Sequence, residues 1–159
     1  MITRQARSGD IEAILAIWNP LIRETSVTFT TEEKTQAGVG RDIVTRGEAF
    51  LVAEQAGAIL GFASFGAFRS GPGYVHTGEH TIILDTRARG RGAGRALMTR
   101  LEEVARGQGV HALVAGVSGE NTGAIAFHRS IGFSEVGRMP EVGRKFGRWM
   151  DLVLLQKLL

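Results

Sequence analysis

A run of glycines and arginines is the part of the sequence best suited to bind an anion. It is Leu84-Asp85-Thr86-Arg87-Ala88-Arg89-Gly90-Arg91-Gly92-Ala93-Gly94-Arg95-Ala96-Leu97, and it joins a predicted strand to a predicted helix. Glycine lets a backbone approach a ligand closely and adopt positive φ. The first turn of a helix presents unpaired N–H groups and a partial positive charge, and arginine pairs directly with phosphate. We therefore expect a phosphate site formed by Arg89, Gly90, Arg91, Gly92, Ala93, Gly94 and Arg95.

The spacing of these glycines excludes two common phosphate motifs. A P-loop needs Gly-Lys-Ser/Thr after a four-residue gap, and a dinucleotide fingerprint needs G-x-G-x-x-G, whereas this run has G-x-G-x-G. Spacing alone leaves open a surface turn that binds nothing. An RNA contact of the RGG type is disfavoured, because the run lies between two regular elements rather than in a disordered tail.

Composition limits the class of protein. The 159 residues fit one domain, 1–159, and the 43% of apolar residues can form a core without disulfides or a structural metal. There is no apolar run of about 18 residues, which argues against a membrane span, and the first residues lack the apolar stretch of a secretory signal. The absence of cysteine excludes a disulfide framework and a cysteine-based zinc site, so we expect a cytoplasmic protein.

The charge distribution favours a small anionic ligand. The net charge is 19 minus 16, or +3, yet four arginines lie between residues 87 and 95. Nucleic-acid binding usually needs a wider basic face, so we expect no nucleic acid. We also expect no metal, because His76 and His80, four apart in a strand, would lie about 13 Å from each other.

Hydrophobic periodicity predicts the elements that must position this run. Apolar spacing from Ile11 predicts a helix that Pro20 kinks or ends near Asn19, and Thr30 with Glu33 predicts a capping box that opens a helix running to about Arg46. Two further helices are expected over 92–108 and 121–131. Strands are expected over 2–7, 49–54, 59–65, 76–84, 113–117, 134–139 and 149–155, with 25–29 extended. This order, βααβββαβαββ, indicates an α/β domain with helices on a mainly antiparallel sheet.

Two motifs resemble the GNAT superfamily of N-acetyltransferases. Arg89-x-x-Gly92-x-Gly94 matches its acetyl-CoA pyrophosphate loop, and Asn121-x-x-Ala124-x-x-Phe127-x-x-x-Ile131-Gly132-Phe133 matches its downstream signature. The resemblance covers nearly the whole chain and implies the GNAT fold, with acetyl-CoA as cosubstrate. It implies that the strand Ile82-Ile83-Leu84 splays from its neighbour and pairs with the pantetheine arm. It also implies that Asn121 contacts the arm or the thioester.

Further segments resemble the phosphinothricin and methionine sulfone (sulfoximine) acetyltransferases within that superfamily. They are Trp18-Asn19, the stretches 26–32 and 61–65, Phe68-Arg69, Tyr74, Glu79-His80-Thr81 and the stretch 142–151. This resemblance implies acetylation of the α-amino group of a small amino-acid analogue, and a homodimer.

The resemblance also suggests chemical roles. Acyl transfer needs a neutral amine and a proton for the departing thiolate. Glu79 lies one strand step before the proposed cofactor strand, where the family has a carboxylate, and is expected to be the general base. His128 follows Phe127 where many members carry a tyrosine that acts as general acid, and is a candidate for that role. Because histidine replaces that tyrosine, a packing or capping role for His128 stays open.

Five residues besides Glu79 are candidates for binding the acceptor. Arg69 and Tyr74 flank a loop with Gly73, and can supply a bidentate cation and a hydroxyl to a carboxylate and a sulfone or phosphinate. Phe29 can close the pocket on the aliphatic part of the acceptor, and Lys145 can enter from the C-terminal hairpin.

Two other functions stay open at this point. The same machinery can acetylate a protein N-terminus or a polyamine, or the domain can bind CoA as a regulatory ligand without catalysis.

Overall fold

The computed structural model describes residues 1–159, and its elements follow the expected order. The helices are α1 (Ile11–Glu24), α2 (Gln36–Arg46), α3 (Ala93–Gly107) and α4 (Thr122–Ser130). The strands are β1 (Ile2–Gln5), β2 (Phe50–Gln55), β3 (Ala58–Ala67), β4 (Thr77–Leu84), β5 (Ala112–Ser118), β6 (Ser134–Lys145) and β7 (Arg148–Leu158).

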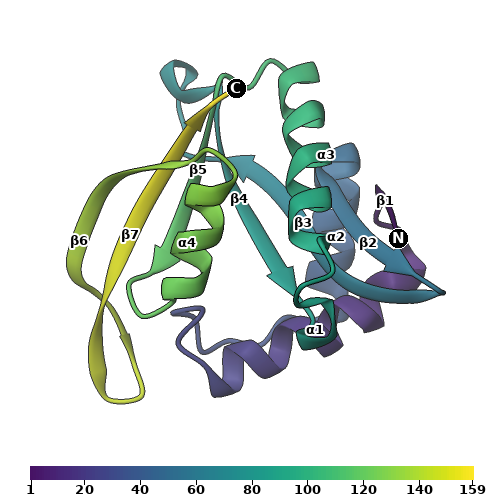
Figure 1. Ribbon diagram of the computed structural model, residues 1–159, viewed down its shortest axis with the longest axis horizontal. Coiled ribbons are helices and arrows are strands. Elements are labelled where there is room, and N and C mark those ends of the chain that lie inside the picture. The colour runs from purple at the N-terminus through teal and green to yellow at the C-terminus, as the bar shows by residue number, and fades with distance from the viewer.

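All seven strands form one sheet in the order β1-β2-β3-β4-β5-β7-β6 (Figure 1). Every neighbouring pair is antiparallel except β4 and β5, which run parallel. The predicted mixed, mainly antiparallel sheet flanked by helices is confirmed.

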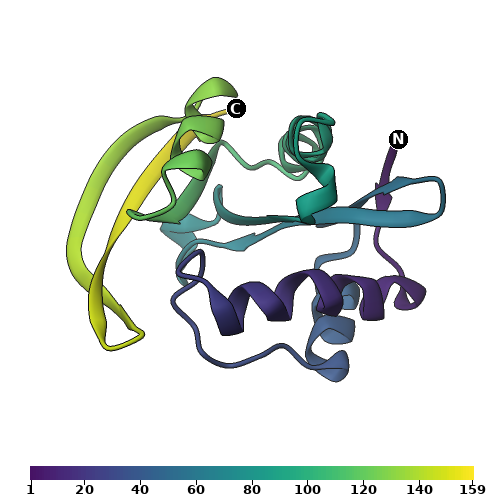
Figure 2. The same cartoon turned by 60° about the horizontal axis from the view of Figure 1, so that its bottom comes forward.

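Helices cover both faces of the sheet, with α3 and α4 on one side and α1 and α2 on the other (Figure 2). One core lies under α3 and includes Leu97, Leu101 and Leu113, which are fully buried. The other lies under α1 and α2 and includes Ile14 and Phe62. Alternation along each strand therefore decides on which side of the sheet a side chain lies.

The helix α1 continues through Pro20 to Glu24, so the expectation that it ends near Asn19 is wrong, whereas the alternative of a kink stays a prediction. Proline removes one backbone donor and costs stability inside a helix. Ile22, two residues later, is completely buried, and this burial outweighs that cost. The helix ends where the Thr25 hydroxyl donates to the Leu21 carbonyl at 2.6 Å.

The predicted capping box at Thr30 and Glu33 is also wrong, because α2 begins six residues after Thr30. The Thr30 hydroxyl accepts from the Glu32 amide, and the Glu33 carboxylate pairs with Arg23 at 2.6 Å. The N-cap is Thr35, whose hydroxyl accepts from the Gly38 amide at 3.0 Å. Residues 25–35 therefore form an irregular connection rather than a strand and a helix start.

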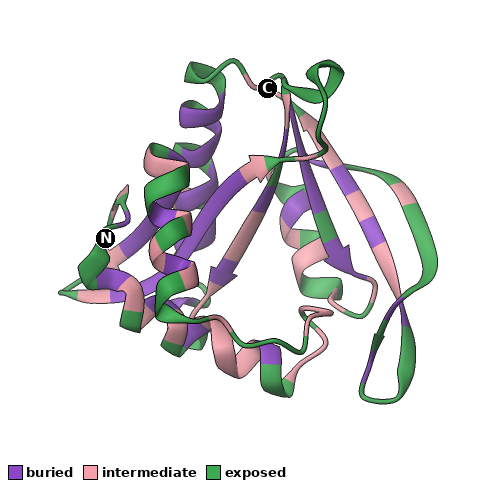
Figure 3. Cartoon of the chain, turned by 180° about the vertical axis from the view of Figure 1, so that it is seen from behind, coloured by how far each residue is buried: buried purple, intermediate pink, exposed green.

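The β6–β7 hairpin is longer than predicted, and its outer strand β6 is largely exposed (Figure 3). Its pairing is irregular between Met139 and Gly143, and regular again from Gly143↔Met150 to Lys145↔Arg148. The tip of the hairpin lies beside the connection between α1 and α2 (Figure 2), and Lys145 bonds to that connection.

Candidate active site

A cavity of about 900 Å³ lies where β4 and β5 diverge. Their ladder contains three pairs, Thr77↔Ala112, Gly78↔Leu113 and Glu79↔Val114, so residues 80–84 have no partner on β5. The expected splay of Ile82-Ile83-Leu84 from the neighbouring strand is confirmed, and all three line the cavity. An extended molecule can therefore pair with the free edge of β4 in this gap.

The cavity has two halves, one on each side of the sheet. We call the part lined by Arg89, the start of α3, Asn121 and Phe127 the α3 half. We call the part lined by Trp18, residues 27–30, Glu79, Gly116 and Leu152 the α1 half. The two halves meet at the gap between β4 and β5, so groups bound on opposite sides can come into contact there.

The start of α3 has the geometry of an anion site and lines the α3 half. Gly90 and Gly92 have φ of 73° and 76°, which glycine adopts without strain. No side chain caps the helix, and the amides of Gly92, Ala93, Gly94 and Arg95 donate to no acceptor within the protein. These free amides and the helix dipole favour a bound phosphate.

The arginines of this loop differ in how free their charge is. Arg87 binds both carboxylate oxygens of Asp85, at 2.9 and 2.7 Å, so its charge is largely neutralised. Arg89, Arg91 and Arg95 are exposed and pair with no carboxylate. Arg89 and Arg95 line the cavity, whereas Arg91 does not. Two of the three free arginines can therefore reach an anion at the start of α3.

Gly94 and Asn121 fix how the helices approach this half. A Cβ on Gly94 would lie 3.2 Å from both Leu84 and Phe127, so a glycine lets α3 pack closely against β4 and α4. The side-chain oxygen Oδ1 of Asn121 caps α4 by accepting from the Ala124 amide at 3.1 Å. Its side-chain amide keeps its two donors, and the residue lines the cavity as expected.

Glu79 lies at the last pair of β4 and β5, on the α1 side. Its neighbours Gly78 and His80 pack on the α3 side, so alternation directs Glu79 to the other face. Its Oε1 lies 3.4 Å from the position that a Cβ on Gly116 would occupy, and the side chain has no ion-pair partner. The carboxylate is therefore exposed and free to accept a proton at the junction of the two halves.

His80 and His128 form a buried pair on the α3 side, with ring nitrogens Nε2 2.9 Å apart. His128 Nδ1 donates to the Ala124 carbonyl at 2.7 Å, so in the neutral pair the Nε2 of His128 accepts from the Nε2 of His80. The Nδ1 of His80 then carries a lone pair and has no partner.

Burial keeps this pair neutral. It lowers the pKa of His80 to about 3, the nearby ring of His128 acting in the same direction, and burial also lowers the pKa of His128. A neutral histidine with both nitrogens engaged is a poor proton donor, so this geometry does not favour His128 as the general acid. That role stays a prediction.

The structure brings Phe29 to the site but not the other expected acceptor residues. Phe29 lines the α1 half. Arg69, Gly73 and Tyr74 are exposed, precede β4 and do not line the cavity. The Arg69 guanidinium instead lies over the Phe68 ring, 5.5 Å from its centre. Their part in binding the acceptor stays a prediction.

Sequence analysis missed Gly116 and the pairing role of His80. A glycine inside a strand is a signal of close approach, so Gly116 could have been found from its position in β5. Nothing local indicates the pairing of His80, because its partner lies 48 residues away.

No group of three or more His, Cys, Asp or Glu side chains is arranged to hold a metal ion. None of the helices combines the length and the apolar character that crossing a membrane requires.

The sequence model of the family described as "Acetyltransferase (GNAT) family" matches residues 14–133. The chain belongs to this family. This acetyltransferase is 39% identical over 157 residues to an L-methionine sulfoximine/L-methionine sulfone acetyltransferase of Pseudomonas aeruginosa. The aligned region covers 96% of this chain and 91% of the relative.

Two solved structures have closely similar folds. The ribosomal-protein-alanine N-acetyltransferase of Brucella melitensis has a TM-score of 0.94 and 39% identity, with all of both chains covered. The yncA acetyltransferase of Salmonella typhimurium, solved with its cofactor acetyl-CoA, has a TM-score of 0.94 and 36% identity, with 100% of this chain and 94% of that chain covered.

The enzyme is an N-acetyltransferase that uses acetyl-CoA, and its α3 half fits this cosubstrate. The four free amides and two arginines suit a diphosphate, and the free edge of β4 suits an extended amide-containing arm. Bound acetyl-CoA supplies an activated acetyl group as a thioester.

Proposed function

We propose that this acetyltransferase acts on the α-amino group of a small amino-acid analogue of the phosphinothricin, methionine sulfone or methionine sulfoximine type. The observation that carries the proposal is the unpaired carboxylate of Glu79 in the α1 half, opposite the free amides of α3. The α1 half is bounded by Trp18, Phe29 and Leu152, which suit a short aliphatic side chain. The name of the relative from Pseudomonas aeruginosa supports an acceptor of this kind.

In this proposal Glu79 is the general base. The carboxylate takes up the proton that the acceptor ammonium must lose, directly or through one water. An α-amino group has a pKa of about 8, so a modest base suffices. The neutral amine nitrogen then attacks the thioester carbonyl carbon and forms the new carbon–nitrogen bond as the carbon–sulfur bond breaks. The nitrogen loses its extra proton, and the leaving sulfur takes up one proton, so the products are the amide and the CoA thiol.

The residues of the α3 half position the cosubstrate in this proposal. The amides of Gly92, Ala93, Gly94 and Arg95 hold the diphosphate, with Arg89 and the Arg95 side chain neutralising its charge. The backbone of Ile82, Ile83 and Leu84 pairs with the arm, and Asn121 donates to it.

We also propose a homodimer, with a cytoplasmic location where acetyl-CoA is available. Five large apolar side chains are about half exposed on the β6–β7 hairpin, and we take this hairpin as the candidate interface because large apolar and aromatic side chains are enriched in interfaces. They are Val136, Met139, Val142, Phe146 and Trp149.

A protein N-terminus is the second candidate acceptor. It is favoured by the similarity to the enzyme of Brucella melitensis, whose name specifies a ribosomal-protein alanine. A peptide also presents an α-amino group.

A panel of amines distinguishes these acceptors. We expect CoA thiol release with methionine sulfone, methionine sulfoximine or phosphinothricin to exceed that with an alanine-terminated peptide or a polyamine by about 100-fold in kcat/KM. Faster turnover of the peptide would favour the second candidate. Tight CoA binding with no turnover of any amine would favour a CoA-binding regulator and contradict both.

A further inference from the structure

The segment 25–30 has little regular structure of its own, and its residues 27–30 line the α1 half. Its first residue is held to α1 by the Thr25 amide and hydroxyl, which both donate to the Leu21 carbonyl. Its far side is held by Asn19, whose side chain bonds to the Lys34 amide and carbonyl at 2.8 and 3.0 Å. Thr28 and Phe29 lie between these two anchors, so their position depends on contacts with other elements.

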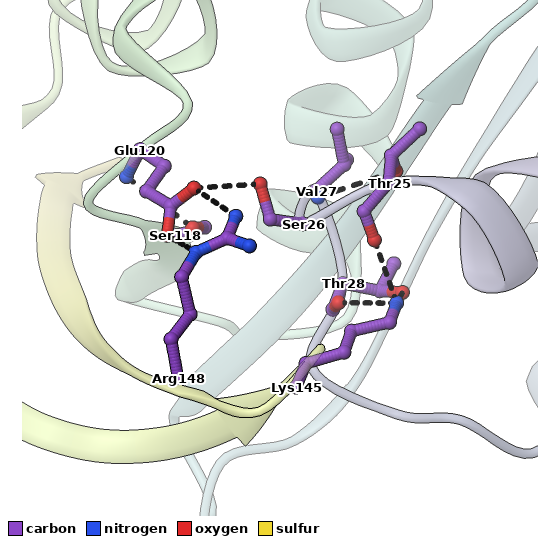
Figure 4. Close-up of polar contacts among 8 residues, drawn as sticks. All are labelled: Thr25, Ser26, Val27, Thr28, Ser118, Glu120, Lys145 and Arg148. Carbon is purple, nitrogen blue, oxygen red and sulfur yellow. Dashed lines mark hydrogen bonds and ion pairs between the residues drawn. The ribbon is translucent and has the colours of Figure 1, made fainter.

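Lys145, the last residue of β6, supplies such a contact. Its Nζ donates to the Thr25 carbonyl at 2.7 Å and to the Thr28 carbonyl at 2.8 Å, with the Thr28 hydroxyl at 3.4 Å (Figure 4). The lysine is 3% exposed and pairs with no carboxylate. Burial lowers the pKa of its ammonium group, because the charged form loses its hydration. The three oxygens of the segment accept hydrogen bonds from the ammonium and replace part of that lost hydration.

Gly143 lies two residues before Lys145 and supports Phe29. In the regular pairing with β7, residues two apart share a face, so Gly143 and Lys145 both face the segment. A Cβ on Gly143 would lie 2.6 Å from the Phe29 ring, closer than atoms can approach. The Phe29 ring therefore packs directly on the Gly143 backbone.

A second, exposed contact joins the same two elements. Glu120, in the turn before α4, accepts from Ser26 at 3.1 Å and from Arg148 at 2.7 Å (Figure 4). These side chains are in solvent, where such contacts contribute little. Lys145 is therefore the stronger of the two links.

We propose that Lys145 is a positioning residue for the acceptor. Together with Gly143 it holds the segment 25–29 so that Phe29 closes the α1 half at a fixed depth. The hairpin tip thereby sets the length of acceptor side chain that the enzyme accepts. The inference rests on the proposed function, since it assigns to the α1 half the task of binding the acceptor side chain.

The first test replaces Lys145 by methionine, which keeps the length and removes the three donors. The reference is the acceptor with the highest kcat/KM in the amine panel. We expect its KM to rise by about tenfold in Lys145→Met, with the KM for acetyl-CoA changing by less than about twofold, because the α3 half is untouched. Arg144→Met is the matched control: Arg144 lies on the opposite face of β6, over Trp149, and its loss should leave both constants unchanged. An unchanged acceptor KM in Lys145→Met would overturn the proposal.

The second test leaves the buried charge of Lys145 in place. Gly143→Ala should displace Phe29 and lower kcat/KM for the reference acceptor, and Phe29→Leu added to Gly143→Ala should restore much of the loss because leucine is smaller. The double variant should also shift the preference along a series of amino acids of increasing side-chain length. Additive losses without rescue would overturn the proposal. If the wild-type enzyme turns over no amine of the panel, the proposed function itself fails, which is a different result from an unchanged variant.

Discussion

The two halves of the cavity are built in different ways. The α3 half comes mainly from one continuous run, residues 82–95, whose bonds are local, such as the Arg87 amide to Asp85 and the Arg91 amide to Ala88. The α1 half is assembled from distant segments, and Lys145 reaches residues 120 and 117 positions earlier in the chain. If the α3 half binds the cosubstrate and the α1 half the acceptor, as we propose, the first site is encoded locally and the second depends on tertiary contacts, so substitutions should separate the two.

The largest expected effect is at the junction of the halves. Glu79→Gln keeps the shape of the side chain and removes the base, so kcat should fall by about 10²–10⁴-fold. The KM for acetyl-CoA should change by less than about twofold, since Glu79 lies on the α1 side. Steady-state kinetics across the pH range measure both constants. Equal rates in Glu79→Gln and wild type at every pH would remove Glu79 as the base.

The second largest effect is expected from a substitution that disrupts only the α3 half. Gly92→Val forces a β-branched residue to adopt a φ of 76°, which costs about 1–2 kcal/mol or displaces the amides that follow. We expect the affinity for CoA, measured by calorimetry, to fall by about tenfold or more.

The control is Gly57→Val. Gly57 has a φ of 78° in the β2–β3 turn and does not line the cavity. It carries the same strain and should leave CoA binding unchanged. Unaltered affinity in Gly92→Val would refute the assignment of the phosphate site.

The buried histidine pair predicts a pH dependence of stability. The pKa of His80 in the folded protein is about 3, below the ordinary value of 6.5, so the unfolded chain binds a proton between these values and the folded chain does not. This contribution to stability is complete above pH 6.5 and is lost as the pH falls toward 3. The loss is about 1 kcal/mol per pH unit.

Urea unfolding at pH 7 and pH 5 measures this dependence. In His80→Asn the free energy of unfolding should fall less over the same interval, because one buried imidazole is absent. Identical pH slopes for the two proteins would contradict the neutral pair.

The smallest effect sharpens the view of the α1 half. Ser26→Ala removes an exposed bond of 3.1 Å, so the acceptor KM should change by less than about twofold and stability by less than about 0.5 kcal/mol. Steady-state kinetics of Ser26→Ala and Lys145→Met, measured side by side, compare the two acceptor KM values. A loss as large as that of Lys145→Met would mean that the exposed contact, rather than the buried lysine, holds the segment.

Prediction from sequence succeeded where the signal was local and failed where distant burial outweighed it. The order of the elements along the chain, the run of glycines and the start of α3 follow from periodicity and from the conformational freedom of glycine. The helix end expected at Pro20 was wrong because Ile22 is buried beyond it. The capping box was wrong because Glu33 binds Arg23 instead of the chain near Thr30.

The sequence by itself determined the order of the elements, the family and an uncapped, glycine-rich start of α3, because each depends on residues within a few turns of one another. The tertiary structure alone decided that α1 continues past Pro20, that two histidines share a buried bond, and that Lys145 supports the segment before Phe29. The physical reason is that burial and long-range hydrogen bonds act between residues that only the folded chain brings together.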